Sequence, residues 1–246
     1  MSGHNKWSTI KRKKGALDAK RSKIFSKINK EITVAVKESG PDPDSNPRLR
    51  LAIANAKGAS MPKDNIQRAI SKGSDKDSAS FIECTFEGYA NGGVAIFLEA
   101  TTDNQQRTIS NVRMYFNKFN GSLGTNGSLS FIFDRKGIFT IPQGTLDPDD
   151  FEMEMIEAGA EDMQLEEGYF TVTTAMENFG AMMKKLETLK IEPENAQLQR
   201  IPKDTTKLDL ESSKKVMRLI ELFEEDDDIQ AVYHNLEMTD ELMDSL

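Results

Sequence analysis

The residues most able to do chemistry are cations gathered at the start of the chain. Ten of the first thirty residues are Lys or Arg, and Asp18 is the only acid among them. Such side chains bind phosphate oxygens, and Trp7, the single Trp of the protein, can stack on an exposed base. Because a segment this cationic repels itself, a polyanionic partner explains it better than a solvated tail does, so we predict nucleic-acid binding. The predicted contact residues are Lys6, Trp7, Lys11, Arg12, Lys13, Lys14, Lys20, Arg21, Lys23, Lys27 and Lys30.

The charge of the whole chain hides this basic segment. Residues 1–78 carry 18 Lys and Arg against 8 Asp and Glu, a net charge of +10. The remainder holds 14 bases and 32 acids, a net charge of −18, and the total is −8. This asymmetry predicts a basic binding module attached to an acidic body, which repels phosphates that approach from the wrong side.

Metal and catalytic chemistry have little support in the sequence. Cys84 is the only cysteine, and His4 and His234 lie near opposite ends of the chain, so no zinc ligand set is evident. The run Asp226–Asp228 lacks the alternating spacing of a calcium loop, and we expect a solvated turn there. No zinc-finger, basic-zipper or RNA-recognition motif is present either. We therefore predict that the protein is not an enzyme and uses no metal, cofactor or small-molecule substrate.

Two glycine-rich stretches, GYANGG and NGSLGTNG, are better explained as turns between strands than as phosphate-binding loops. Polar residues that lie near these turns in the sequence, including Asn104 and Arg107, could form a surface on which a partner docks.

Several absences bear on location and assembly. No apolar run approaches the ~20 residues needed to span a bilayer, and no apolar segment follows the charged N-terminus as in a secretory signal. One cysteine allows no intramolecular disulfide, so nothing requires an oxidising compartment. We predict a soluble cytoplasmic protein, without a membrane partner and monomeric.

The cationic segment leads into a predicted small helical bundle. Apolar residues recur every three or four positions from Leu17 until Ser39-Gly40-Pro41 ends the helix. Asn46-Pro47 and Met61-Pro62 open two more helices, expected over 47–59 and 62–72. A helix-turn-helix remains open as an alternative, although the second helix lacks an evident base-reading cluster and the Pro-containing connections look long.

Beyond a polar linker, strands and helices alternate. The strands, helix and closing strand of a first α+β layer are expected at 81–89, 94–100, 105–119 and 129–134. A complete β-α-β-β-α-β succession is expected at 137–142, 150–158, 162–167, 169–174, 176–189 and 196–201. A helix at 211–225 and a strand at 228–234 then supply the two elements that the first layer lacks.

The predicted fold class is therefore α+β, with an N-terminal three-helix domain followed by two ferredoxin-like α/β domains, the third inserted into the second. The predicted domains are a basic helical domain at 1–78, a ferredoxin-like domain at 79–134 plus 206–237, an inserted ferredoxin-like domain at 135–205, and an acidic mobile tail at 238–246.

Long stretches of the chain resemble the YebC family of bacterial regulatory proteins. The start, GHNKWSTIKRKKGALDAKRSKIFSK, is similar to the family signature GHSKWxxIKxxKxxxDxKRxKxF. The other matching stretches are DPDSNPRLR, MPKDNIQRAI, FEGYANGGVAIFLEATTDNQQRT, GSLGTNGSLSFIF and DIQAVYHN. The resemblance covers nearly the whole chain, and it implies the same three-domain architecture. Ala90-Asn91 departs from the GPGG-type loops that are commoner in the family.

The resemblance also implies a function. The family is described as probable transcriptional regulators that bind DNA, which makes this our leading expectation. A mitochondrial relative is similar to a translational activator of a respiratory oxidase, and some members are regarded as ribosome-associated factors that help synthesis through proline-rich stretches. Translation regulation through ribosomal RNA is therefore the alternative, and the lack of a presequence favours the bacterial type.

The family signature falls on particular positions of this chain. By position, its N-terminal part corresponds to Gly3, His4, Lys6, Trp7, Ile10, Lys11, Asp18, Lys20, Arg21, Lys23 and Phe25. The family's loop before the third helix falls on Met61, Pro62 and Lys63, which join Asn104 and Arg107 as possible partner-docking residues.

Overall fold

A computed structural model describes residues 18–75 and 80–245. Contacts between Cα atoms divide them into two compact units. Among the described residues, one unit contains 18–23, 80–134 and 201–245, and the other contains 24–75 and 135–200. Segment 135–200 thus interrupts the first unit along the chain.

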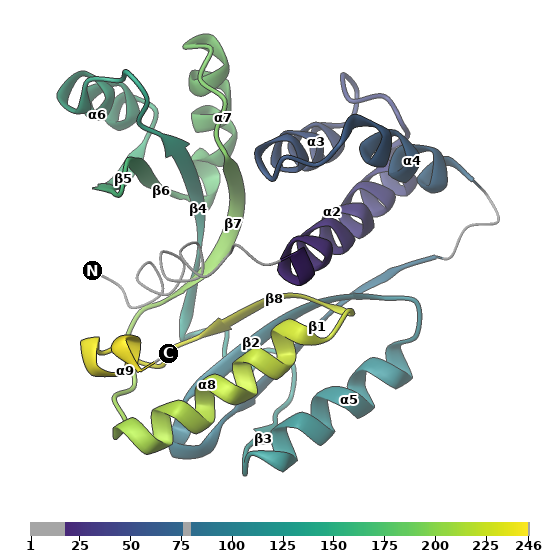
Figure 1. The fold of residues 1–246 in the computed structure, drawn as a ribbon, viewed down its shortest axis with the longest axis vertical. Coiled ribbons are helices and arrows are strands. Elements are labelled where there is room, and N and C mark those ends of the chain that lie inside the picture. Colours follow the sequence, from purple (N-terminus) through teal and green to yellow (C-terminus); the bar gives the residue numbers. More distant parts are fainter. Residues whose placement is uncertain (1–17, 76–79, 246) are drawn as a thin grey trace. The chain divides into compact units, whose positions relative to one another are not determined.

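The first unit is built on a four-stranded sheet in the order β3-β1-β2-β8 (Figure 1). Its strands are β1 (Ile82–Tyr89), β2 (Ala95–Thr102), β3 (Ser122–Leu123) and β8 (Ile229–His234). The hairpin β1–β2, which turns through the 3-10 helix η1 (Asn91–Gly93), occupies the centre. Strand β8 pairs antiparallel with β2, so the sheet is completed by the last strand of the chain.

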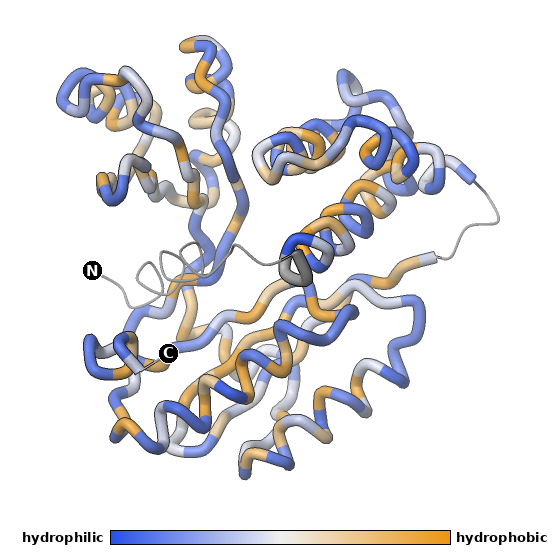
Figure 2. The backbone as a smooth tube through the Cα atoms, in the orientation of Figure 1, coloured by the Kyte–Doolittle hydropathy of each residue, from blue (hydrophilic) through white to orange (hydrophobic). Residues whose placement is uncertain are grey.

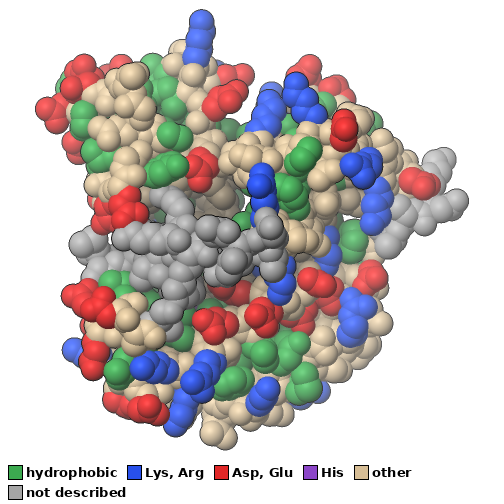
Figure 3. Space-filling view, in the orientation of Figure 1, with side chains coloured by type: hydrophobic (Ala, Val, Ile, Leu, Met, Phe, Trp, Pro, Cys, Tyr) green, Lys and Arg blue, Asp and Glu red, His purple; other side chains and the backbone are tan. Residues whose placement is uncertain are grey.

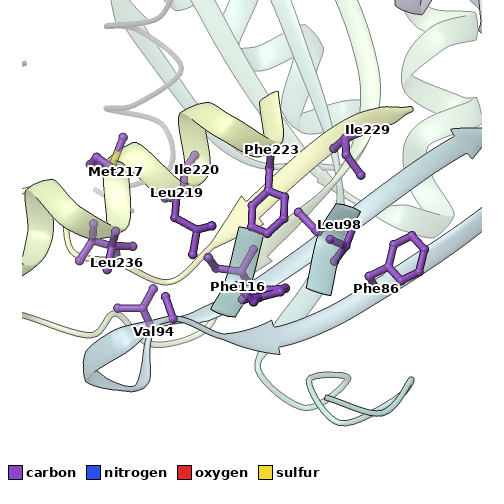
Figure 4. Packing of buried hydrophobic residues seen from close by; sticks show 14 of the residues in the cluster. Phe86, Val94, Leu98, Phe116, Met217, Leu219, Ile220, Phe223, Ile229 and Leu236 are labelled. Carbon is purple, nitrogen blue, oxygen red and sulfur yellow. The ribbon is translucent and has the colours of Figure 1, made fainter. Parts of the chain in front are cut away.

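Helices α5 (Gln105–Lys118) and α8 (Leu210–Glu225) contribute to the hydrophobic core of this sheet. The rings of Phe116 and Phe223, one from each helix, lie 5.0 Å apart between their centroids (Figure 4). Both contact the cluster that includes Phe86 and Leu98, and all four side chains are buried. The helical apolar spacing of 105–119 and 211–225 therefore places these elements as predicted.

The prediction of a mobile acidic tail at 238–246 was wrong. Met238 and Leu242 are 3 % and 0 % exposed and belong to the same core cluster. A short helix, α9 (Asp240–Asp244), forms there, and Thr239 caps it by accepting a hydrogen bond from the Leu242 backbone N–H. Met238 and Leu242 stand among acidic residues in the sequence, and the free energy gained by burying their side chains outweighs the repulsion between those acids.

The strand expected at 129–134 was also wrong. Residues 126–132 are turns, and the sheet's remaining strand is the two-residue β3. The cause is Glu87, whose buried carboxylate accepts hydrogen bonds from the backbone N–H groups of Gly127 and Leu129 at 2.7 and 2.6 Å. Those amides are therefore satisfied by a side chain instead of by a neighbouring strand.

The second unit contains another four-stranded sheet, in the order β5-β6-β4-β7. Its strands are β4 (Phe133–Pro142), β5 (Ala160–Glu166), β6 (Tyr169–Ala175) and β7 (Asn195–Pro202). Helices α6 (Pro148–Glu157) and α7 (Phe179–Thr188) contribute to its core, and the 3-10 helix η2 (Met176–Asn178) precedes α7. The hairpin β5–β6 turns where Glu167 and Gly168 adopt φ of 51° and 80°.

Three helices complete the second unit, namely α2 (Asp18–Ser39) from Ile24 onward, α3 (Pro47–Gly58) and α4 (Lys63–Ser74). Asn46 caps α3 as predicted, because its side chain accepts from the Leu49 N–H at 3.0 Å. The same amide donates to the Ala35 carbonyl at 2.7 Å, which ties α3 to α2. Figure 2 shows the resulting mixture of apolar and polar positions along each helix.

Helix α3 also contacts the sheet of its own unit. The side chain of Asn55 pairs with the backbone of Ala196 on edge strand β7, donating at 2.9 Å and accepting at 2.9 Å. At Gly58 a Cβ atom would lie 1.8 Å from the Glu194 carbonyl oxygen, so only glycine permits this approach. Sequence patterns that treated the bundle as a separate domain did not foresee this contact.

The predicted fold class is confirmed, with a helical part and two α/β parts, one of them inserted. The elements of the second sheet follow the expected β-α-β-β-α-β succession. In the first sheet, the hairpin β1–β2 occupies the two central positions. The domain boundaries that we assigned by residue number remain predictions.

We predict that Glu87→Gln lowers the free energy of unfolding by about 2 kcal/mol, because an amide NH2 would then face backbone donors in a buried site. Chemical denaturation of the full chain measures this. Glu221→Gln, on the exposed side of α8 in the same unit, is the control and should change stability by less than about 0.5 kcal/mol. Equal stability of the two variants would contradict the anchoring role of Glu87.

Candidate nucleic-acid interface

Helix α2 carries its cations on one face and the apolar residues that pack into the bundle on the opposite face. Lys23, Lys27 and Lys30 are spaced by four and three residues, so they lie along one face of the helix. Apolar residues spaced in the same way, including Ile32 and Val36, face the buried core of the bundle. The three cations therefore form a stripe opposite the packed face, which we call the α2 stripe.

The other predicted contact residues are placed unevenly. Lys6, Trp7, Lys11, Arg12, Lys13 and Lys14 lie outside the described residues. Lys20 is in α2, but its side chain lies outside the description as well. Arg21 is exposed, whereas the residues of the α2 stripe are half-buried, and the Lys23 ammonium donates a hydrogen bond to the Glu225 carbonyl at 2.7 Å.

Arg48 stabilises the bundle instead of extending the α2 stripe. Its guanidinium bridges Glu31 and Glu38 of α2, each at 2.8 Å. The single charge of Arg48 thereby offsets part of the negative charge of these two carboxylates, which lie next to the cations of α2. The bundle thus keeps acids paired where they would otherwise repel a phosphate.

Helix α4 presents a polar exposed face that the sequence interpretation undervalued. Gln67, Arg68 and Ser71 are exposed, while Ile66 and Ala69 are buried on the opposite side. These are residue types that donate to and accept from base edges. Lys and Arg side chains are visible over the bundle in Figure 3.

The connection between α3 and α4 is short. Only residues 59–62 separate the two helices, so the long connection that we expected before the third helix was wrong. The turn is tight because Ser60 adopts a φ of 58° and the Met61 N–H donates to the Ala56 carbonyl at 2.9 Å. A four-residue connection has the length of the turn in a helix-turn-helix.

Of the possible docking residues before α4, Met61 is 5 % exposed and packs in the core of the bundle. Pro62 and Lys63 are exposed at the start of α4, where Pro62 occupies the N-cap position. Of the three residues, only these two are therefore exposed on the surface.

Asn104 and Arg107 are engaged within the first unit. Asn104 caps α5 by accepting from the Arg107 N–H at 3.0 Å. The Arg107 guanidinium donates to Asp228 at 2.7 Å and to Asp103 at 2.7 Å. Its hydrogen bonds with Asp228, and then with Asp103, raise the pKa of Arg107 above its ordinary value. The side chain remains 46 % exposed, so one edge of this ion pair faces solvent.

The solvated turn expected at Asp226–Asp228 was wrong. Asp228 is 5 % exposed and accepts from the Thr108 hydroxyl at 2.9 Å as well as from Arg107. Asp226 accepts from the hydroxyl of Tyr115 at 3.2 Å. These bonds fasten the turn between α8 and β8 to helix α5. No sequence spacing signalled this, because the partners lie more than a hundred residues apart in the chain.

Burial and the charges of these acids also raise the pKa values of two nearby side chains. Burial, followed by the charge of Asp226, raises the pKa of Tyr115. Burial, with a smaller effect of the charge of Asp228, raises the pKa of Cys84. The thiol of Cys84 is therefore kept protonated at neutral pH, as expected of a packing residue.

The described residues contain no group of three or more His, Cys, Asp or Glu side chains that could hold a metal ion. Among the helices of the same described ranges, none is both long and apolar enough to cross a membrane.

Two family models match the chain. The TACO1/YebC N-terminal domain matches residues 5–76, and the TACO1/YebC second and third domain matches residues 81–236. The chain belongs to the TACO1/YebC family. The resemblance that we drew from the N-terminal signature is therefore confirmed.

Relatives of this TACO1/YebC chain match it over nearly its whole length. A probable transcriptional regulatory protein from Amoebophilus asiaticus is 53 % identical over 239 residues, covering 96 % of this chain and 98 % of the relative. One of the same description from Rubrobacter xylanophilus is 46 % identical, covering 99 % and 98 %. The crystal structure of a conserved hypothetical protein from Aquifex aeolicus superposes with a TM-score of 0.80 at 43 % identity, covering 89 % of this chain and 91 % of that one.

We predict that Asp228→Asn lowers the free energy of unfolding by about 2 kcal/mol, because Arg107 and Thr108 lose their charged acceptor. Thermal or denaturant unfolding of the full chain measures this. Asp204→Asn, at an exposed position of the same unit, removes the same charge and should cost less than about 0.5 kcal/mol. If both variants lose the same stability, net charge and not the buried contact is responsible.

Alkylation of Cys84 should follow its raised pKa. Because the thiolate is the reactive form, the rate with iodoacetamide should rise at a higher pH than the rate of a free cysteine does. Since Cys84 is the single cysteine, mass spectrometry of the intact chain reports this site alone. A profile that coincides with that of free cysteine in the folded protein would contradict the effect of burial.

Proposed function

We propose that this protein is a nucleic-acid-binding regulator of gene expression and, in its leading form, a DNA-binding transcriptional regulator. The observation that carries the proposal is the α2 stripe, which sets three cations opposite the packed face of a helix. It belongs to a segment in which ten of the first thirty residues are cationic. Phosphates spaced along a nucleic-acid backbone are the natural ligands of such an array. The names of the relatives support the same class.

Charge outside the basic region favours one orientation of binding. Beyond residue 78 the net charge is −18, so a polyanion is attracted to the bundle and repelled elsewhere. Cytoplasmic location and a monomeric state belong to the same proposal.

The short α3–α4 connection supports duplex DNA as the partner. A recognition helix needs an exposed face with donors and acceptors, and α4 offers Gln67, Arg68 and Ser71. Helix α2 would then contact phosphates and set the register, while α4 would meet base edges in the major groove.

The second candidate is a ribosome-associated translation factor that binds ribosomal RNA. Arg68, the strongest potential base reader on α4, donates to Asn65 at 2.8 Å and to the Asp64 carbonyl at 3.2 Å within its own helix. If those bonds persist on binding, the bundle grips phosphates without reading sequence. Such binding suits a large structured RNA whose position is fixed by several contacts.

Two charge-removal variants test the proposal. We predict that changing Lys23, Lys27 and Lys30 together to Ala, or Lys11, Arg12, Lys13 and Lys14 together to Ala, weakens binding and leaves the fold intact. For the α2 variant, the log–log slope of affinity against salt should become shallower by about 2 to 3, because about that many phosphate contacts are lost. Fluorescence anisotropy with labelled duplex DNA and with structured RNA measures both effects.

A matched control removes three cations elsewhere. Lys207, Lys215 and Arg218 are exposed in the first unit, so their joint change to Ala alters net charge equally without touching the α2 stripe. Unchanged affinity in both test variants, or an equal loss in the control, would contradict the proposal. Among binding-competent proteins, crosslinked recovery of discrete promoter fragments supports the transcriptional form. Sedimentation with ribosomes that is lost in the test variants supports the translational form.

A further inference from the structure

The turn at 124–132 is held rigidly at both ends. Besides the Gly127 and Leu129 amides, the Glu87 carboxylate accepts from the hydroxyl of Ser128 at 3.4 Å, and its own backbone carbonyl accepts from the Gly124 N–H at 2.7 Å. At the other end, the Ile132 carbonyl accepts from the Lys203 N–H at 2.9 Å. A buried carboxylate that is committed to one turn indicates that the shape of the turn matters.

Apolar packing against the sheet also holds this turn in place. Leu129 and Phe133 are buried in a cluster with Phe97 and Tyr233 of the sheet. The rings of Phe97 and Phe133 meet edge to face, with 6.3 Å between their centroids. The backbone on either side of residues 130–132 is therefore anchored.

Between these anchors Phe131 points into solvent. Its side chain is 66 % exposed, the largest value among the exposed large hydrophobic residues of the described chain. Single exposed apolar residues are common, but this ring is an aromatic side chain on an anchored turn. It differs from Met153, 62 % exposed, whose flexible side chain projects from a regular helix.

The surroundings of Phe131 fit a nucleobase better than a protein pocket. Its exposed neighbours in the turn, among them Asn126 and Ser130, are polar, whereas the core of a protein interface is apolar. Stacking on a base needs only one accessible ring face. Lys203, whose backbone bonds to the same turn, has a side chain that is 48 % exposed. Its ion pair with Asp134 at 3.3 Å is exposed and weak, so a phosphate can compete for it.

We propose that Phe131 is a stacking platform for an unpaired nucleobase, with Lys203 available to the adjoining phosphate. The inference rests on the proposed nucleic-acid binding and adds a contact outside the helical bundle. A base in a duplex is already stacked on both faces, so the platform selects single-stranded or looped-out nucleotides.

The test compares side chains of similar size with and without an aromatic ring. Phe131→Leu keeps an apolar group but removes the ring, and it should weaken binding of a short single-stranded oligonucleotide by about tenfold. Phe131→Trp should bind at least as tightly as the native chain. Binding of duplexes of the same sequence should stay within about twofold for both variants, because paired bases are not accessible to the ring. Anisotropy titrations with single-stranded RNA and single-stranded DNA show which nucleotide the platform takes.

Met153→Leu, which alters an equally exposed apolar residue on α6, is the control and should leave all affinities unchanged. An unchanged single-strand affinity for Phe131→Leu would overturn the inference, as would an equal loss on single strands and duplexes. If the α2 variant still weakens binding in that case, the proposed function stands and the platform alone fails. If the native chain binds no nucleic acid, both fail together.

Discussion

The pairing of β2 with β8 is the constraint on which the first unit depends. Ile96 lies opposite His234, and the whole inserted segment 135–200 separates the two strands along the chain. The core between the sheet and its helices closes only when α8 and β8 arrive from the far side of the insertion. An insertion is tolerated because its ends leave and return close together, so closing the loop costs little more as it lengthens.

The α+β fold class could be predicted because its signals are local. Apolar residues at helical spacing identified α5 and α8, and Asn46 before a proline identified the start of α3. Counting elements then revealed the insertion, since the first layer lacked a helix and a strand that appeared only after the second layer. None of these inferences required knowledge of which residues touch across the chain.

Three of the errors share the opposite cause, because each depends on a contact distant in sequence. The apolar run at 129–134 looks like a strand until Glu87 captures its amides. The acidic ending looks mobile until Leu242 enters the core. Asp228 looks solvated until Arg107 and Thr108 surround it. A buried carboxylate is rare unless it is paired, so sequence reasoning places acids on the surface by default.

Some features of the candidate interface could likewise be predicted from the sequence, and others could not. The cationic stripe on α2 follows from spacing alone, whereas the tight α3–α4 turn and the exposed ring of Phe131 required coordinates. The two kinds of contact also differ physically. Lysine–phosphate attraction weakens as the salt concentration rises, because the release of counterions then contributes less free energy. It also carries no information about the base. Stacking depends little on salt and requires an unpaired base. A regulator that combines them therefore gains affinity from its basic bundle and selects among nucleic-acid structures through the ring. In that case the salt dependence of binding and its preference for single strands are properties of different residues, and either can be removed without the other.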